Sequence, residues 1–197
     1  MKKIVIFASG TGSNAENIIQ YFKKNTSNSV VAVFSNNWNA KVLEKAKILE
    51  VPTVTFNKDE LYGDFVLSKL NAYQPDLIVL AGFLLKFPEQ IIAKYPNQII
   101  NIHPALLPKY GGKGMYGKHV HQAVLDNHET ETGITIHFVN EHYDEGGIIF
   151  QNSVSIIDCT SADEIASKVH ELEHRYFPEV INQLLTPNSQ LPTPNFK

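Results

Sequence analysis

Four short apolar runs recur along the first half of the chain. They are Ile4–Ala8, Val30–Phe34, Leu77–Ala81 and Ile99–Ile102. Each run is rich in Val, Ile or Leu and has no charged residue, as is typical of parallel strands covered on both faces. The segments between and beside them predict helices over Asn14–Lys24, Ala40–Glu50, Asp59–Tyr73 and Pro88–Lys94. Because strands that alternate with helices form right-handed βαβ units, we predict an α/β fold with a doubly wound, mostly parallel sheet.

The pattern changes after Pro108. A glycine-rich loop, Tyr110–Gly117, precedes a predicted helix at Lys118–Asp126. Ile134–Val139 then alternates between apolar and polar residues, and Ile148–Ile156 alternates in part. Alternation of this kind indicates strands with two different faces, so we expect late, antiparallel additions to the sheet.

A long helix is expected to close the fold. Ser161 and Glu164 have the spacing of a capping box, and an apolar stripe follows at helical intervals. Its members are Ile165, Val169, Leu172 and Tyr176. Pro178 should kink or interrupt this helix, because proline lacks the backbone N–H. We therefore expect one domain over residues 1–185, with halves at 1–100 and 101–185, and a proline-rich tail at 186–197.

Composition narrows the class of protein. A chain of 197 residues with 43% hydrophobic and 19% charged residues is typical of a soluble globular protein. The net charge of −3 argues against non-specific binding to nucleic acid, which needs a basic face. The single cysteine, Cys159, excludes an internal disulfide framework and fits the cytoplasm. The apolar start is too short for a signal peptide, and no run reaches the length of a membrane span.

The octapeptide Asn101–Pro108 is the strongest candidate for chemistry. Residues two apart on a strand share a face, so Asn101 and His103 can converge on one point. An amide donor beside a titratable ring suits a reaction that passes through an oxyanion. An ordinary hydrogen-bonded pair at a strand end is the alternative, and the tripeptide alone favours it.

A glycine-containing turn, Ser9–Asn14, follows the first predicted strand. Glycines let the backbone approach a ligand, and the N–H groups of the next helix can hold an anion. The turn lacks the G-x-G-x-x-G pattern of dinucleotide sites, because position 15 is Ala. A small phosphomonoester is therefore the favoured ligand, with a plain helix-capping turn weighed about equally.

The acidic loop Asn140–Gly147 joins the two late strands. Asp144 in this loop can orient an imidazole and keep it protonated, because a nearby carboxylate raises a histidine pKa. A solvated hairpin loop is the simpler interpretation, and the loop by itself favours it.

The remaining histidines carry weaker signals. We expect His119 and His121 to be structural or exposed, and His137 to pack or to form a hydrogen bond. His170 and Glu173 share a helix face, which makes His170 a possible neighbour of a substrate. His170, Glu173 and His174 could together bind a metal ion, but we do not favour this interpretation.

Four motifs in register resemble the phosphoribosylglycinamide formyltransferase family over about residues 2–185. They are Gly10-x-Gly12-Ser13-Asn14, Ala81-Gly82-Phe83, the Asn101–Pro108 octapeptide and the Asp144 loop. The resemblance implies a Rossmann-like fold with late antiparallel strands and a long C-terminal helix. It implies transfer of a formyl group from 10-formyltetrahydrofolate to the amine of glycinamide ribonucleotide, in purine synthesis.

The resemblance also implies roles for individual residues. Asn101, His103 and Asp144 match the catalytic residues. The residues expected at glycinamide ribonucleotide are Thr11, Gly12, Ser13, Asn14, Lys58, Phe83, Pro104, His170 and Glu173. The residues expected at the folate are Leu84, Leu85, Lys86, Phe87, Val139, Asn140 and Glu141. Two departures stand out: Lys58 occurs where the family often has Arg nearby, and the basic residue Lys86 has moved by one place.

The implied reaction uses small-molecule substrates and no metal, nucleic acid or membrane, in a cytoplasmic monomer or weak homodimer. A formyltetrahydrofolate hydrolase is one alternative, although it usually carries an N-terminal regulatory domain. A methionyl-tRNA formyltransferase would need a further domain and a basic surface. A non-catalytic nucleotide-binding module is another alternative, against which Asn101, His103 and Asp144 together argue.

Overall fold

The computed structural model describes residues 1–24 and 28–186. The chain divides into two compact units, Met1–Ile100 and a second that begins at Asn101. The strand β5 (Ile99–His103) carries the chain from one to the other. The predicted tail at 186–197 lies outside the described residues, except for Thr186, which follows the last helix.

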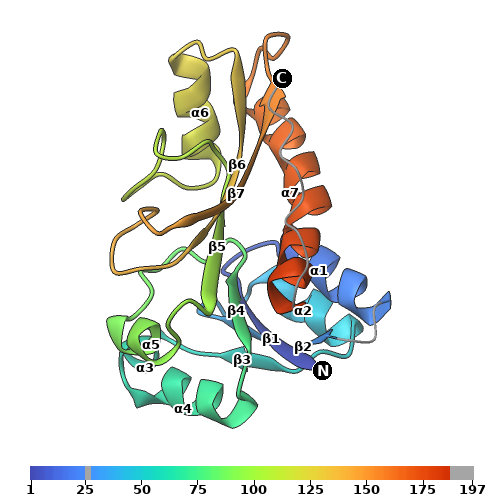
Figure 1. Cartoon of the computed structure of the whole chain (residues 1–197), viewed down its shortest axis with the longest axis vertical. Helices are drawn as coiled ribbons and strands as arrows, with labels where there is room; N and C mark the ends of the chain where they lie inside the picture. The colour runs from blue at the N-terminus through green and yellow to red at the C-terminus, as the bar shows by residue number, and fades with distance from the viewer. Residues whose placement is uncertain (25–27, 187–197) are drawn as a thin grey trace. The chain divides into compact units, whose positions relative to one another are not determined.

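The first unit alternates strands and helices, as the apolar runs predict (Figure 1). Its elements are β1 (Lys2–Phe7), α1 (Ser13–Lys24), β2 (Asn28–Ser35), α2 (Lys41–Ile48), β3 (Thr53–Thr55), α3 (Lys58–Tyr62), α4 (Asp64–Tyr73), β4 (Leu77–Leu80) and α5 (Glu89–Lys94). Parallel pairs join β1 to β2, β1 to β4 and β2 to β3. These pairs are the βαβ units expected from the sequence.

Phe7 lies at the centre of the core of this unit. Its ring stacks on Phe34 at 4.8 Å and meets Phe87 edge-to-face at 5.1 Å. Phe83 and Phe56 meet the same ring at 5.4 Å and 5.9 Å. Aromatic rings bury large apolar areas, so this cluster anchors β1 and the glycine turn that follows it.

Two local features of the first unit differ from the sequence prediction. Strand β3 was not predicted, because Thr53–Thr55 is short, partly polar and only half-buried or exposed. The single helix predicted over Asp59–Tyr73 is two helices separated at Gly63. The extended backbone of Gly63 ends α3, which begins with a capping box between Asn57 and Glu60.

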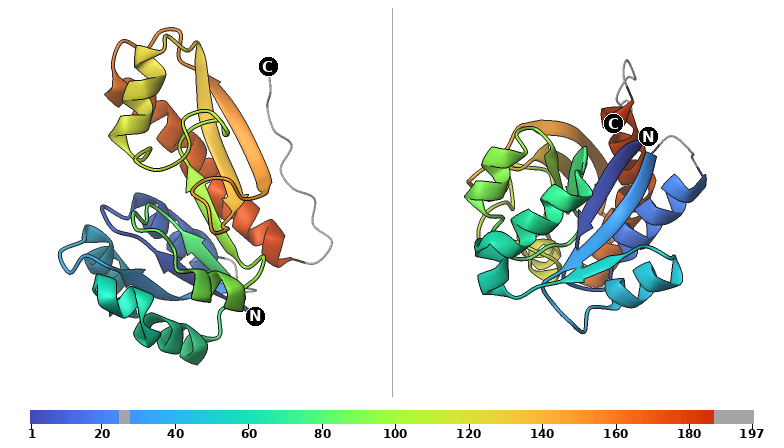
Figure 2. Two further views of the ribbon diagram at one scale, coloured as in Figure 1. Left: turned by 90° about the vertical axis from the view of Figure 1, so that its left-hand side faces the viewer. Right: turned by 90° about the horizontal axis from the view of Figure 1, so that it is seen from below.

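The second unit continues with α6 (Lys118–Asp126), β6 (Glu131–Phe138), β7 (Ile148–Ser155) and α7 (Ala162–Leu185). Strands β6 and β7 pair antiparallel, which confirms the expected late antiparallel addition. Helix α7 contacts β6, β7 and α6, and Figure 2 shows it running alongside the two strands. The described strands form one sheet in the order β3-β2-β1-β4-β5-β6-β7, so the predicted fold class is confirmed.

Helix α7 is one uninterrupted helix. Ser161 accepts a hydrogen bond from the backbone N–H of Glu164, as the capping box predicts. The Glu164 carboxylate, however, accepts from the N–H of Thr160 at 2.6 Å. The predicted interruption at Pro178 is wrong. Pro178 is buried between apolar neighbours such as Phe177 and Val180, and burial of this face holds the helix together despite the missing N–H.

Candidate active site

Asn101 and His103 lie in the last part of β5, where the second unit begins. The ring of His103 is buried, with 3% of the residue exposed, and Asn101 is half-buried. The chain after them is tied to β6 by Thr135, whose hydroxyl donates to Ala105 O at 2.7 Å and accepts from Leu107 N at 3.0 Å. The exit of the octapeptide is therefore held by the neighbouring strand.

The orientation of the His103 ring follows from its partners. Nε2 lies 2.7 Å from the carbonyl oxygen of Tyr110, and a carbonyl only accepts, so Nε2 carries the hydrogen. Nδ1 faces Oδ2 of Asp144 at 3.6 Å. That separation is too long for a direct hydrogen bond. The second nitrogen of the ring is thus directed toward a carboxylate without being bonded to it.

Burial lowers the pKa of His103 below its ordinary value of 6.5, although Asp144 and the Tyr110 carbonyl both oppose this. The expectation that Asp144 keeps the free imidazole protonated therefore needs correction. The carboxylate acts in the expected direction, but loss of water around the ring has the larger effect. A pKa below 6.5 favours the neutral form of the His103 ring at neutral pH.

Asp144 lies in the loop between β6 and β7, with a left-handed φ of 58°. Its Oδ2 accepts from the backbone N–H of Gly112 at 2.9 Å, and its Oδ1 lies 3.5 Å from Nε2 of His137. Burial raises the pKa of this carboxyl, but the surrounding groups, among them His103 and the Gly112 N–H, bring the pKa below its ordinary value. The group is a carboxylate beside the His103 ring.

His137 contacts two of the candidate site residues, Asn101 and Asp144, which the sequence analysis did not predict. It is buried at the end of β6, and Nδ1 lies 2.8 Å from the Phe138 carbonyl, so Nδ1 carries the hydrogen. Nε2 then accepts from Nδ2 of Asn101 at 3.1 Å. The predicted hydrogen bond is present, and its partner is the Asn101 amide. The inward position of His137 on an alternating strand was the available signal.

Helices α6 and α7 bring further titratable groups into the second unit. Nδ1 of His170 lies 3.2 Å from Oε2 of Glu173, and the rings of His170 and His174 have centroids 3.9 Å apart. His121 is buried, and burial lowers its pKa, while Glu173 opposes that change. Glu173 acts in the same direction on His103. No group of three potential metal ligands was found within residues 1–24 and 28–186.

The predicted phosphate turn lies in the first unit, after β1. Gly12 has φ of 69°, and a Cβ there would collide with Val42 of α2, so the position requires glycine. The carbonyl of Gly10 accepts from Val42 N at 3.2 Å. Helix α1 begins at Ser13, which places Ser13 and Asn14 in its first turn. The backbone N–H groups of a first turn have no partners within the helix.

The other residues predicted to bind a substrate differ in their exposure to solvent. Lys58 is exposed at the start of α3, Thr11 is exposed, and Pro104 is half-buried. Among the predicted folate residues, Leu84 is 50% exposed, whereas Phe87 is buried in the Phe7 cluster. Leu85, Lys86, Val139 and Asn140 are half-buried, and Glu141 is exposed. The side chain of Phe87 is thus part of the core of the first unit.

A sequence model described as formyl transferase matches residues 2–181, so the chain belongs to the formyl transferase family. Membership implies a formyl donor of the folate type. The chain is 37% identical to the phosphoribosylglycinamide formyltransferase of Escherichia coli, covering 91% of this chain and 85% of that protein. It is also 37% identical to the chloroplastic phosphoribosylglycinamide formyltransferase of Arabidopsis thaliana, with 93% of this chain and 65% of the relative covered. The chain therefore spans less than two thirds of that relative.

Solved structures support the same relationship. The crystal structure of phosphoribosylglycinamide formyltransferase from Bacillus halodurans matches with a TM-score of 0.86 and 34% identity. That match covers 95% of this chain and 97% of the other chain. Among the described residues, no helix is both long and apolar enough to cross a membrane.

Proposed function

We propose that the protein transfers the formyl group of 10-formyltetrahydrofolate to the amine of glycinamide ribonucleotide, a step of purine synthesis. The names of the relatives support this assignment. The observation that carries it is the buried His103 ring, whose Nδ1 faces the Asp144 carboxylate across 3.6 Å, with the Asn101 amide on the same strand. An amide donor, an imidazole and a carboxylate are the groups that acyl transfer to an amine needs.

In the proposed reaction, the substrate amine attacks the formyl carbon and the carbonyl oxygen becomes an oxyanion. In this scheme the Asn101 amide donates to this oxygen, and Nδ1 of His103 donates to it once the ring has taken up a proton. The proton that leaves the amine passes by way of Asp144 and His103 to N10 of the folate. The bond between the formyl carbon and N10 then breaks, the carbonyl reforms, and tetrahydrofolate leaves.

The lowered pKa of His103 fits this sequence of events. A neutral ring can take up a proton as negative charge develops on the formyl oxygen, because an adjacent oxyanion favours the imidazolium. The charge pair then exists in the intermediate and not in the free protein. Interactions that strengthen toward the transition state raise the turnover rate, whereas uniform binding does not.

The glycine turn is the proposed phosphate site. Thr11, Gly12, Ser13 and Asn14 would supply backbone N–H groups at the start of α1, and Lys58 is the proposed cation. The N-terminus of a helix of 12 residues favours an anion, because the helix dipole places partial positive charge there. Phe83, Pro104, His170 and Glu173 complete the proposed substrate residues, with Glu173 at the ribose hydroxyls.

The proposed folate residues are Leu84, Leu85, Lys86, Phe87, Val139, Asn140 and Glu141. Because the Phe87 ring is packed in the core, only its backbone is offered to the ligand. The Asn140 side chain accepts from the N–H of His142 at 2.9 Å and shapes the start of the acidic loop. We further propose one catalytic domain over residues 1–185, with a phosphate-binding half and a folate half.

The proposed enzyme is a metal-free cytoplasmic monomer or weak homodimer that acts on small molecules. One assay tests the activity: the protein is mixed with 10-formyltetrahydrofolate with and without glycinamide ribonucleotide. Tetrahydrofolate produced only with the ribonucleotide is expected. Product without it would indicate a hydrolase, and no product would indicate a binding module.

The His103→Ala variant links the activity to this site. Loss of one donor to an oxyanion costs about a hundredfold or more in turnover. His128→Asn, at an exposed histidine outside the site, is the matched control and should keep full activity. Wild-type turnover in His103→Ala would overturn the scheme.

A further inference from the structure

The segment Tyr110–Gly112 contacts both the imidazole and the carboxylate of the candidate site. The carbonyl of Tyr110 accepts from Nε2 of His103 at 2.7 Å, and the N–H of Gly112 donates to Oδ2 of Asp144 at 2.9 Å. A Cβ at Gly111 would lie 2.7 Å from Leu107 Cδ2 and 3.3 Å from Asp144 Cβ. This close packing means that a shift of the segment would move both catalytic groups.

Tyr110 adopts an unusual backbone conformation for a residue with a side chain. Its φ is 58°, in the left-handed region that glycine occupies far more readily. The next two residues of this loop are glycines, whereas position 110 carries a large aromatic side chain. A bulky residue in a disfavoured conformation is retained when its surroundings hold it there.

A hydrogen bond of the Tyr110 phenol holds the residue in this conformation. Its hydroxyl donates to Oε1 of Glu129 at 2.9 Å, and the Lys109 ammonium lies 2.9 Å from the same oxygen. Burial and the Glu129 carboxylate raise the pKa of Tyr110 to about 12, so the phenol remains a donor at any physiological pH. Lys109 and Tyr110 in turn lower the pKa of Glu129, which keeps it an acceptor.

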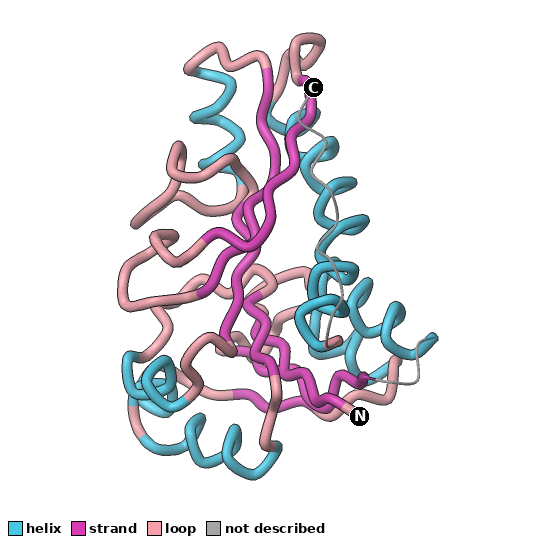
Figure 3. The backbone as a smooth tube through the Cα atoms, viewed as in Figure 1, coloured by secondary structure: helices cyan, strands magenta, loops and turns pink. Residues whose placement is uncertain are grey.

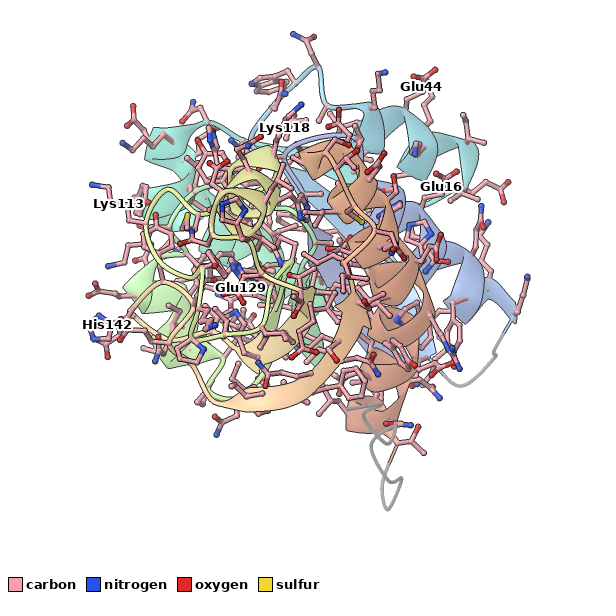
Figure 4. The ribbon with its side chains drawn as sticks, turned by 90° about the horizontal axis from the view of Figure 1, so that it is seen from above. Glu16, Glu44, Lys113, Lys118, Glu129 and His142 are labelled. Atoms are coloured by element: carbon pink, nitrogen blue, oxygen red, sulfur yellow. The ribbon has the colours of Figure 1, made fainter. Side chains whose placement is uncertain are left out.

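Glu129 is itself fixed by the fold. It lies between α6 and β6, and its backbone N–H donates to Val124 O at 3.3 Å. Figure 4 shows Glu129 near α6, whereas the labelled Lys113 and His142 lie at the outer edge of the view. Figure 3 shows the chain between β5 and α6 as a long loop without regular structure. The Tyr110 ring is thus a link between this loop and a regular part of the unit.

We propose that Tyr110 and Glu129 form a positioning pair that holds the Tyr110 carbonyl on His103 and so keeps Nδ1 of the ring for the reaction. Neither side chain needs to touch a substrate. Glu129 acts through the Tyr110 hydroxyl, and Tyr110 acts through its carbonyl. This inference rests on the proposed function, because it assigns the pair to the imidazole of the same site.

The test uses Tyr110→Phe, which keeps the ring and removes only the hydroxyl. Turnover is expected to fall about tenfold, with KM for each substrate changing less than twofold, because the loss lies in orientation of a catalytic group. In ¹⁵N spectra, the His103 ring is expected to change from one tautomer, protonated on Nε2, to a mixture of two. Its pKa should also fall, because the carbonyl bond favours the charged ring.

Two further variants make the result specific. Glu129→Gln keeps an acceptor for the phenol and should cause a smaller change in the same direction. Tyr116→Phe removes a hydroxyl from an exposed tyrosine of the same loop and should leave turnover and spectra unchanged. Urea unfolding of each variant checks that the fold is retained.

The outcomes separate this inference from the proposed function. Wild-type turnover and an unchanged His103 tautomer in both Tyr110→Phe and Glu129→Gln would overturn the positioning role. A changed tautomer in a protein without formyl transfer would support the positioning role and overturn the proposed function. Equal effects of Tyr110→Phe and Tyr116→Phe would also count against the pair.

Discussion

Asn101 and His137 are joined through a single ring nitrogen, since Nδ2 of Asn101 lies 3.1 Å from Nε2 of His137. The other ring nitrogen, Nδ1, lies 2.8 Å from the Phe138 carbonyl and must carry the hydrogen. Nε2 is therefore an acceptor, and one of the two N–H groups of the amide is committed to it. In the proposed reaction, the second N–H of the amide donates to the developing oxyanion.

This relationship predicts that His137 positions the Asn101 amide. In His137→Phe the amide loses its acceptor, and we expect turnover to fall about tenfold or more. His137→Gln, whose carbonyl can still accept, should lose less. The rates are measured with Asn101→Ala and the double variant as well. Losses that simply multiply would show that the two residues act independently.

Asp144→Asn tests the carboxylate. The amide oxygen can still accept from the Gly112 N–H, but the charge beside His103 is lost. We expect turnover to fall about a hundredfold, while the free energy of unfolding changes by about 1 kcal/mol or less. Turnover is compared with the urea midpoint. A loss of activity matched by a similar loss of stability would indicate a structural role instead.

The buried histidines predict a dependence of stability on pH. Burial lowers the pKa of His103 and of His121 below the ordinary value of 6.5, so the unfolded chain binds more protons than the folded one below that value. Above about pH 6.5 these two histidines do not reduce the free energy of unfolding. The free energy of unfolding decreases as the pH falls from there toward the folded-state pKa values. Urea unfolding near neutral pH and at about pH 5.5 measures the difference.

His121→Gln should reduce this pH dependence, because it removes one group that takes up a proton only on unfolding. His128→Asn, at an exposed histidine, is the control and should leave it unchanged. The same slope in the wild type and His121→Gln would show that His121 does not contribute.

The two glycines of the proposed phosphate turn, Gly10 and Gly12, offer a matched pair of variants. A Cβ at Gly12 would collide with Val42, and the φ of 69° is unfavourable for alanine, whereas a Cβ at Gly10 would meet no atom within 4 Å. We expect Gly12→Ala to destabilise the protein by about 1–3 kcal/mol and to raise KM for the ribonucleotide. Gly10→Ala should behave like the wild type. Similar KM values in the two variants would argue against a phosphate site at this turn.

Much of the fold follows from local patterns. The four apolar runs became β1, β2, β4 and β5, and the helix at Lys118–Asp126 has the predicted bounds. The antiparallel pair was visible as alternation, because a strand with one buried face repeats every two residues. Local patterns did not predict two short features. Strand β3 has only three residues, and the break between α3 and α4 depends on the backbone conformation of the single residue Gly63.

The sequence by itself determined which residues are candidates for chemistry, since Asn101 and His103 share a strand and Asp144 lies in an acidic loop. Only the tertiary structure decided how these side chains are arranged and which groups they contact. The lowered pKa of His103 depends on burial, and the proposed roles of His137, Tyr110 and Glu129 depend on hydrogen bonds that span 36, 7 and 19 residues. The contacts of His137 and Glu129 are set by packing between segments separated in the chain, and the Tyr110 contact is set by the conformation of the loop after β5. The alternating pattern of β6 predicted that His137 points inward, but it did not identify the partner of this ring.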